Sequence, residues 1–157
     1  MRHCGVRDAM ALRSMRLEAL LDSPQAYGST YQECLAWTNR QWRNVCRDWN
    51  HYLGEQDGRV VGVASGGVND RYPSTLWLYG MYVTPRARGT GIAKQLVEVV
   101  AQWARDQGVS SLYLHVAAPM IRARTFYERM GFRATGDVMV MDRDPVIELV
   151  TMVMTLV

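Results

Sequence analysis

The stretch Leu76–Gly108, LWLYGMYVTPRARGTGIAKQLVEVVAQWARDQG, predicts a strand, an arginine-rich turn and a long amphipathic helix. Its first part, Leu76–Val83, is rich in the aromatic and aliphatic residues typical of strands. Pro85 ends the strand, because proline cannot donate to a sheet ladder. Apolar residues then recur at helical spacing up to Gly108, which marks the helix end; they are Ile92, Leu96, Val99, Val100 and Trp103.

The turn between strand and helix, Arg86–Gly91, combines two arginines with two glycines. Gly89 and Gly91 lack a Cβ, so the backbone can take positive φ and a ligand can approach the main chain closely. The amides from Arg88 to Ala93 would face outward at the positive end of the helix dipole, which favours a phosphate. The spacing is neither that of a P-loop nor that of a Rossmann fingerprint. An ordinary strand-to-helix turn is the simpler interpretation and stays open.

A second segment, Arg122–Phe132 (RARTFYERMGF), predicts a short helix that ends at a glycine. Together the two segments resemble the GNAT acetyltransferase superfamily. Arg86-x-x-Gly89-x-Gly91 is similar to the acyl-CoA loop of that family, and the second segment is similar to its second cofactor motif. The detailed match covers about residues 59–136. The resemblance implies an α/β, three-layer α-β-α fold with a central mixed, V-shaped sheet of about seven strands.

Length and composition set limits on domain number and partners. The chain has 157 residues, which suits a single domain over residues 1–157. Its net charge of +3 fits an anionic cofactor and does not by itself indicate nucleic acid, which we do not expect as a partner. No signal peptide and no apolar run of the roughly 20 residues that a membrane span needs are present, so we expect no membrane association and a cytoplasmic location. Cys4, Cys34 and Cys46 match no metal-ligand spacing, which indicates free thiols and no metal site.

The rest of the chain predicts the other strands and the helices that cover them. We expect helices over 9–21, 31–49 and 121–130, and strands over 1–6, 51–56, 59–68, 111–116, 133–141 and 147–156. The strands on either side of the long helix form a β-α-β unit, so they should be parallel. The expected helix over 31–49 carries Trp37, Trp42 and Trp49. These side chains are interpreted either as core anchors or as part of an acceptor pocket.

The resemblance implies acetyl-CoA as co-substrate and assigns it contacts from the strand, the turn and the short helix. Acyl transfer to an amine needs a grip on the CoA diphosphate and a donor for the thioester oxygen. The backbone N–H of Met81, freed by a bulge, would be that donor, and the main chain of Val83 would pair with the pantetheine arm. The implied cofactor-binding residues are Met81, Tyr82, Val83, Arg86, Arg88, Gly89, Thr90, Gly91, Ile92, Ala93, Phe126 and Tyr127.

Tyr127 is the expected general acid, since a phenol with an ordinary pKa of about 10 is protonated at pH 7 and can donate to the departing thiolate. A tyrosine packed beside Phe126 for structure is the alternative. The sequence departs from the family pattern at Trp77, where many members carry a glutamate base, and at Met120, where many carry an asparagine. His115 is then the nearest candidate to accept the amine proton. A structural histidine, or a water chain without a dedicated base, stays open.

The amine acceptor is the least defined partner. Tyr27 and Tyr31 would supply an aromatic wall with cation–π contact, and Asp142 would attract a cationic amine. We expect an N-acetyltransferase that transfers an acetyl group to a primary amine of a small molecule or peptide by direct attack in a ternary complex. A non-catalytic acyl-CoA-binding or sensing domain on the same fold is the alternative. Apolar residues on both faces of the 147–156 strand predict a homodimer, although the domain's own helices would also cover them.

Overall fold

The computed structural model describes all residues 1–157 and contains one sheet of seven strands in the order β1-β2-β3-β4-β5-β7-β6. The strands are β1 Arg2–His3, β2 Asn50–Gln56, β3 Arg59–Asn69, β4 Tyr72–Val83, β5 Ser111–Ala117, β6 Arg133–Met141 and β7 Asp144–Thr155. The helices are α1 Ala9–Asp22, α2 Tyr31–Leu35, α3 Asn39–Asp48, α4 Ile92–Asp106 and α5 Ile121–Arg129.

Strands β4 and β5 are parallel and pair at one end only. Leu76 pairs with Leu112 and Trp77 pairs with Tyr113, and no further pairs join the two strands. Both strands continue beyond these pairs, so they diverge toward their carboxyl ends. All other neighbouring strands are antiparallel. The predicted α/β fold with a mixed, V-shaped sheet of seven strands is therefore confirmed.

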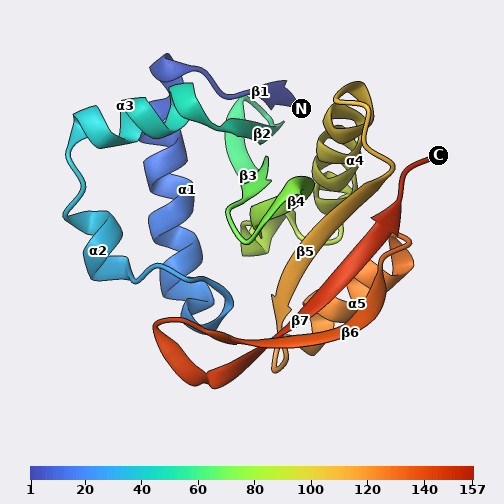
Figure 1. Cartoon of the computed structure of the whole chain (residues 1–157). Helices are drawn as coiled ribbons and strands as arrows, with labels where there is room; N and C mark the ends of the chain where they lie inside the picture. The colour runs from blue at the N-terminus through green and yellow to red at the C-terminus, as the bar shows by residue number, and fades with distance from the viewer.

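Helices cover both faces of the sheet and enclose two apolar cores. Figure 1 shows α1, α2 and α3 on one side of strands β2–β4 and α4 on the other. The larger core joins the apolar face of α4 to the sheet and to α5; its fully buried members include Leu96, Val97, Val100, Leu112 and Met152. The smaller core lies between α1, α3 and the opposite sheet face; its members include Leu12, Leu20, Trp42, Leu53 and Val63.

The prediction of one helix over 31–49 is wrong, because α2 and α3 are separate helices. Thr38 starts α3 with a capping box: Gln41 N donates to Thr38 Oγ1 at 3.2 Å, and Thr38 N donates to Gln41 Oε1 at 2.8 Å. These bonds satisfy the first amides of a new helix where apolar spacing alone would have continued the old one. Of the tryptophans, Trp42 is a core anchor, whereas Trp49 is 43% exposed.

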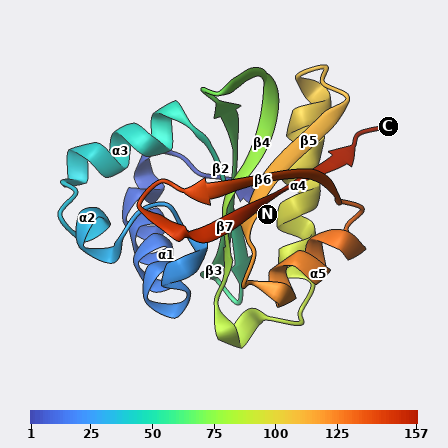
Figure 2. The same cartoon turned by 60° about the horizontal axis from the view of Figure 1, so that its bottom comes forward.

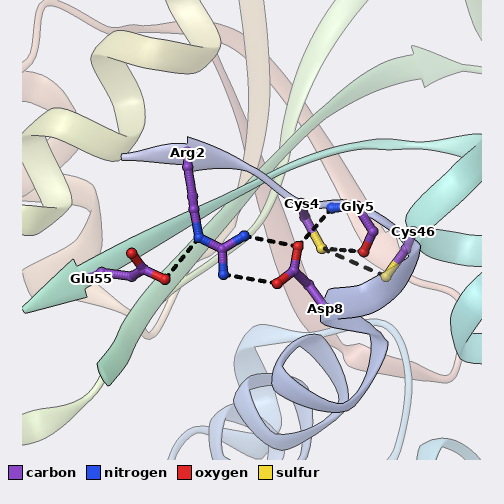
Figure 3. A network of polar contacts seen from close by, with 6 residues as sticks. All are labelled: Arg2, Cys4, Gly5, Asp8, Cys46 and Glu55. Carbon is purple, nitrogen blue, oxygen red and sulfur yellow. Dashed lines mark hydrogen bonds and ion pairs between the residues drawn. The ribbon is translucent and has the colours of Figure 1, made fainter. Parts of the chain in front are cut away.

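A polar network fixes β1 to the start of α1 and to β2 (Figure 3). The Arg2 guanidinium donates two hydrogen bonds of 2.8 Å to the Asp8 carboxylate and one of 2.8 Å to Glu55. The bonds from Arg2 lower the pKa of Asp8. Because its carboxylate is held in this way, Asp8 makes no side-chain cap on α1. Close by, the buried Cys4 and Cys46 sulfurs lie 3.6 Å apart as free thiols.

The glycines of β3 admit bulky side chains that pack against the sheet. A Cβ on Gly66 would lie 2.4 Å from the ring of Trp103 in α4, and a Cβ on Gly67 would lie 2.6 Å from the ring of Trp49. Both rings therefore rest directly on the strand backbone. This close approach gives Gly66 and Gly67 a packing role, because any larger residue would push the rings off the strand.

Replacing Gly66 by alanine should lower the free energy of unfolding by about 1–3 kcal/mol, because the new methyl group forces the Trp103 ring or the strand to move. Urea unfolding followed by circular dichroism measures this change. Gly28→Ala is the control, since a Cβ there would meet no atom within 4 Å; it should change stability by less than about 0.5 kcal/mol. Equal effects in the two variants would contradict the close packing of Trp103.

Candidate functional site

The fork between β4 and β5 opens into a cleft of about 1130 Å³. Its walls come from both halves of the chain, and Figure 2 shows the β6–β7 hairpin reaching across toward the loop after α1. Residues that sequence analysis singled out from distant positions meet at this cleft. Those that line it are Tyr27, Met81, Tyr82, Val83, Arg88, Gly89, Gly91, Ala93, His115, Phe126, Tyr127 and Asp142.

A bulge in β4 lies in the cleft wall at Gly80 and Met81. The register advances from residue 79 to 82 in β4, but only from 63 to 65 in β3, so β4 holds an extra residue here. Gly80 takes φ +57°, a left-handed conformation that glycine adopts without strain. Such a bulge disrupts the ladder locally and redirects the backbone. The bulge expected beside Met81 is confirmed.

The turn before α4 presents a row of unpaired amides. Gly91 is the N-cap of α4 with φ +89°, and Gly89 has φ +79°. The amides of Arg88 and Thr90 bond within the turn. A Cβ on either glycine would meet no protein atom within 4 Å, so the space in front of them is open. The N–H groups that donate to no backbone acceptor are those of Gly89, Gly91, Ile92, Ala93 and Lys94. Free donors at a helix N-terminus are suited to a phosphate.

The two arginines in this turn lie in different surroundings. Arg88 Nε donates to the Val83 carbonyl at 3.1 Å, and its guanidinium pairs with Asp22 of α1. The Arg88 Cζ also lies 5.9 Å from the Tyr82 ring centroid. Arg88 thus braces the cleft wall against α1, and a phosphate contact from its side chain would require breaking the Asp22 pair. Arg86 lies outside the cleft, in a smaller polar depression.

Tyr127 forms part of the inner cleft wall from α5. Its ring packs against Phe126 and Phe132, with centroid distances of 5.3 and 5.7 Å. Burial, with a smaller contribution from Tyr27, raises the pKa of the Tyr127 phenol, and no hydrogen bond opposes this rise. The hydroxyl therefore stays protonated across the neutral range and is available as a donor.

His115 lies in the fork beside the buried Trp77. Its Nδ1 is 3.2 Å from Thr151 Oγ1, and its ring centroid is 4.5 Å from that of Trp77. Burial, together with the positive charge of Arg71, lowers the pKa of His115, so the imidazole is neutral at pH 7. Trp77 donates its Nε1 to Thr75 Oγ1 at 2.6 Å and cannot accept a proton.

Tyr27 connects three parts of the cleft wall. Its hydroxyl donates to the Met81 carbonyl at 2.9 Å, and its own carbonyl accepts from Arg143 Nη2 at 2.9 Å. Its ring carries the Arg16 guanidinium, whose Cζ lies 5.4 Å from the centroid. Burial raises the pKa of Tyr27 to about 12. The ring face that was expected to bind a cationic amine is therefore already next to a cation of the protein.

The other two predicted acceptor contacts differ in position. Asp142 lines the cleft from the β6–β7 hairpin and pairs with Arg71 at 3.4 Å. Tyr31 does not line the cleft; it packs against the smaller core near α1 and α3. Tyr31 is the first residue of α2, so the structure does not bring it together with Tyr27 and Asp142 in the cleft wall.

The acetyltransferase (GNAT) family model matches residues 16–132. The chain belongs to the GNAT acetyltransferase family. Probable N-acetyltransferase family 8 member 5 of Mus musculus is 40% identical over 89 residues, which is 54% of this chain and 39% of that protein. N-acetyltransferase 8 of Homo sapiens is 36% identical over 88 residues, with 54% and 39% covered. The chain thus spans about two fifths of the length of the curated relatives that it matches.

Solved GNAT structures share the fold over the whole chain. Ribosomal-protein-alanine N-acetyltransferase from Brucella melitensis superposes with a TM-score of 0.79 at 25% identity, covering 99% of this chain and 98% of that one. The Salmonella typhimurium protein yncA, in a structure with its cofactor acetyl-CoA, gives a TM-score of 0.80 at 19% identity, covering 99% and 92%. These likenesses support the three-layer α-β-α arrangement around a forked sheet.

In this GNAT domain, some features of the cleft had no sequence-level signal and others had one that was overlooked. Gly80 falls in the second group, since a glycine within a strand indicates a bulge. Arg16 and His51, which also line the cleft, had no signal in the sequence, because they come from distant segments with no shared spacing. Met120, at the usual asparagine position, precedes α5 without capping it.

No helix has both the length and the apolar character to cross a bilayer.

His51 is a buried polar residue of the cleft, 5% exposed, with Nδ1 hydrogen-bonded to Ser65 Oγ. Burial, followed by the positive charge of Arg16, lowers the pKa of His51 to about 4 from the ordinary 6.5. Between these two values the unfolded chain holds a proton that the folded chain does not. Burying His51 in its neutral form therefore carries no penalty above pH 6.5. The free energy of unfolding falls as the pH drops from 6.5 toward 4.

The free energy of unfolding should consequently fall by about 3 kcal/mol between pH 7 and pH 4 through this group. His51→Gln should flatten the dependence over that interval, measured by urea unfolding at stepped pH. If His51→Gln and the wild type show the same slope, the burial of a neutral imidazole is not the cause.

Proposed function

We propose that this GNAT domain is an N-acetyltransferase that moves an acetyl group from acetyl-CoA to a primary amine by direct attack in a ternary complex. The acceptor is a small molecule or a peptide. The observation that carries the proposal is the row of free amides at the head of α4, open to the same cleft as the fork. The acetyl-CoA found with yncA supports the choice of cofactor.

The diphosphate of CoA would accept hydrogen bonds from the amides that begin at Gly89 and Gly91. From there the pantetheine arm would run into the gap beyond the Trp77–Tyr113 pair, where the β4 and β5 backbones are no longer joined. Val83 and Phe126 both line the cleft, and we assign the main chain of Val83 and the ring of Phe126 to contact the arm. The arm would take the place of a strand between the two diverging strands.

The thioester carbonyl would then reach the bulge at Gly80 and Met81. When an amine attacks that carbon, negative charge develops on the oxygen, and the Met81 N–H would donate to it. One such donor typically contributes about 3 kcal/mol of transition-state stabilisation. The hydrogen bond from Tyr27 to the Met81 carbonyl would hold this peptide in position.

Two protons must move for the reaction to balance. The amine loses one as its bond to the carbonyl carbon forms, and neutral His115 is the group we assign to accept it, directly or through water. The departing thiolate gains one as the carbon–sulfur bond breaks, and Tyr127 is the group we assign to donate it. The products are the N-acetylated amine and CoA with a free thiol. No cysteine lies on β4, so we assign no acyl-enzyme.

A non-catalytic acyl-CoA sensor is the second candidate. Trp77 supports it, since this residue fills the usual site of the base and packs between Tyr72 and Tyr113.

A cytoplasmic location and a homodimer also stay proposals. Both edges of β7 are paired within the sheet, so a second copy would not add a strand directly to β7.

Tyr127→Phe should lower kcat by about 10²–10⁴-fold, because it removes the proton donor and keeps the ring. The measurement is acetyl-CoA consumption over a panel of small amines and N-terminal peptides, with CoA affinity measured in parallel by calorimetry. CoA affinity should stay at the wild-type value. Tyr72→Phe is the control at an exposed site outside the cleft, and it should retain full turnover.

Two outcomes would contradict parts of this mechanism. If the wild-type protein binds acetyl-CoA but acetylates none of the amines in the panel, the sensor is favoured. Full turnover by Tyr127→Phe would remove Tyr127 as the acid and leave the fold-level assignment unaffected.

A further inference from the structure

A guanidinium group without an anionic partner lies in the cleft. Arg16, on α1, is half-buried and lines the cleft. Its Nη2 lies 2.5 Å from the place that a Cβ on Gly80 would occupy, so the group rests directly against the bulge. Arg16 takes part in no ion pair. The Arg16 guanidinium also faces the Tyr27 ring, with its Cζ 5.4 Å from the ring centroid.

Most other arginines in the cleft wall have partners; Arg122 has none but is exposed to solvent, whereas Arg16 is half-buried. Arg71 pairs with Asp142 at 3.4 Å, and Arg88 pairs with Asp22. Arg143 donates to the backbone carbonyls of the loop after α1. A charged group that is partly removed from water is costly unless an opposite charge or hydrogen bonds compensate it. The planar fork of arginine matches a carboxylate through two parallel hydrogen bonds.

The distance from Arg16 to the proposed reacting centre is short. Arg16 lies against Gly80, and the oxyanion donor that we propose is the next residue, Met81. Consecutive Cα atoms are about 3.8 Å apart, so an anion held by Arg16 would lie close to the amine that attacks. A ligand that bridges both points would therefore carry its amine and its anionic group close to each other.

We propose that Arg16 binds the carboxylate of the acceptor, which makes the substrate an α-amino acid. This inference rests on the proposed acetyl transfer and specifies its substrate class. Arg16 acts as a specificity-determining residue, and the free α-amine beside the bound carboxylate faces the thioester. The cleft beyond it is lined by Trp37, Trp49 and Tyr79, so the side chain of the amino acid would meet aromatic surface.

The test uses matched pairs of acceptors that differ only in charge: glycine and glycinamide, L-leucine and L-leucinamide, L-phenylalanine and L-phenylalaninamide. Simple alkylamines complete the panel. Wild-type kcat/KM should be about 10- to 100-fold higher for the free acid of at least one pair, the size expected for hydrogen bonds to a charged group. Carboxamides carry the less basic amine, so amine reactivity alone would favour them.

Arg16→Gln should remove this preference by lowering kcat/KM for the acid to the level of its amide, mainly through KM. Arg16→Lys, which keeps the charge without the fork, should retain part of the preference. CoA affinity and the thermal midpoint of both variants should match those of the wild type. Arg13→Gln is the control on the same helix, outside the cleft, and it should leave the preference unchanged.

The outcomes distinguish this inference from the proposed acetyl transfer on which it rests. If the wild type acetylates amides or alkylamines as well as the acids, the carboxylate site is overturned and acetyl transfer stands. If Arg16→Gln lowers acid and amide turnover equally, Arg16 serves the acetyl group or the fold, and the inference is again overturned. If no acceptor of any kind is acetylated by protein that binds CoA, the proposed function fails and this inference fails with it.

Discussion

The short parallel ladder between β4 and β5 is the constraint on which the rest of this structure depends. Two residue pairs hold the strands together, and an aromatic cluster of Tyr72, Trp77, Tyr113 and His115 packs at the point where they part. Because the ladder stops there, backbone groups of both strands face a cleft where a continuous sheet would have paired them. The same divergence leaves the N-terminus of α4 open to that cleft.

The two halves of the chain are coupled through a few polar contacts around this opening. Arg88 of the amide-rich turn pairs with Asp22 at the end of α1, and Tyr27 of the following loop donates to the bulge at Met81. Arg143 in the β6–β7 hairpin donates to the carbonyl of Tyr27. The segment expected to meet the acceptor is thus joined by hydrogen bonds and an ion pair to the segment expected to hold the cofactor.

Sequence analysis predicted what is local and periodic. The bounds of β6 were predicted as they occur, and α4 and α5 agree within a residue or two, because apolar spacing, Pro85 and the helix-ending glycines act over a few residues. The break between α2 and α3 also had a local cause, the Thr38–Gln41 capping box, which the long run of apolar positions obscured.

The contacts that were missed join residues far apart in the chain. Arg88 and Asp22 are separated by 66 positions, and Arg143 and Tyr27 by 116. No spacing pattern in the sequence predicts such pairs, because the residues meet only after the sheet has folded. The same holds for Arg16, whose importance comes from its place against Gly80 and from the lack of a partner. The row of free amides before and at the start of α4 could be predicted, because all of its donors lie between Gly89 and Lys94.

The central claim, that the free amides before α4 hold the CoA diphosphate, is tested most directly by calorimetric titration of CoA into three proteins. Gly91→Ala places a methyl group beside the free amides, and Gly108→Ala makes the same change at the other end of α4, where φ is also positive at +78° and the space is also open. Both variants should lose about 1–2 kcal/mol of folding stability from backbone strain. Gly91→Ala alone should weaken CoA binding, by about tenfold or more. Equal CoA affinity in Gly91→Ala and wild type, or no CoA binding by the wild type, would contradict the account.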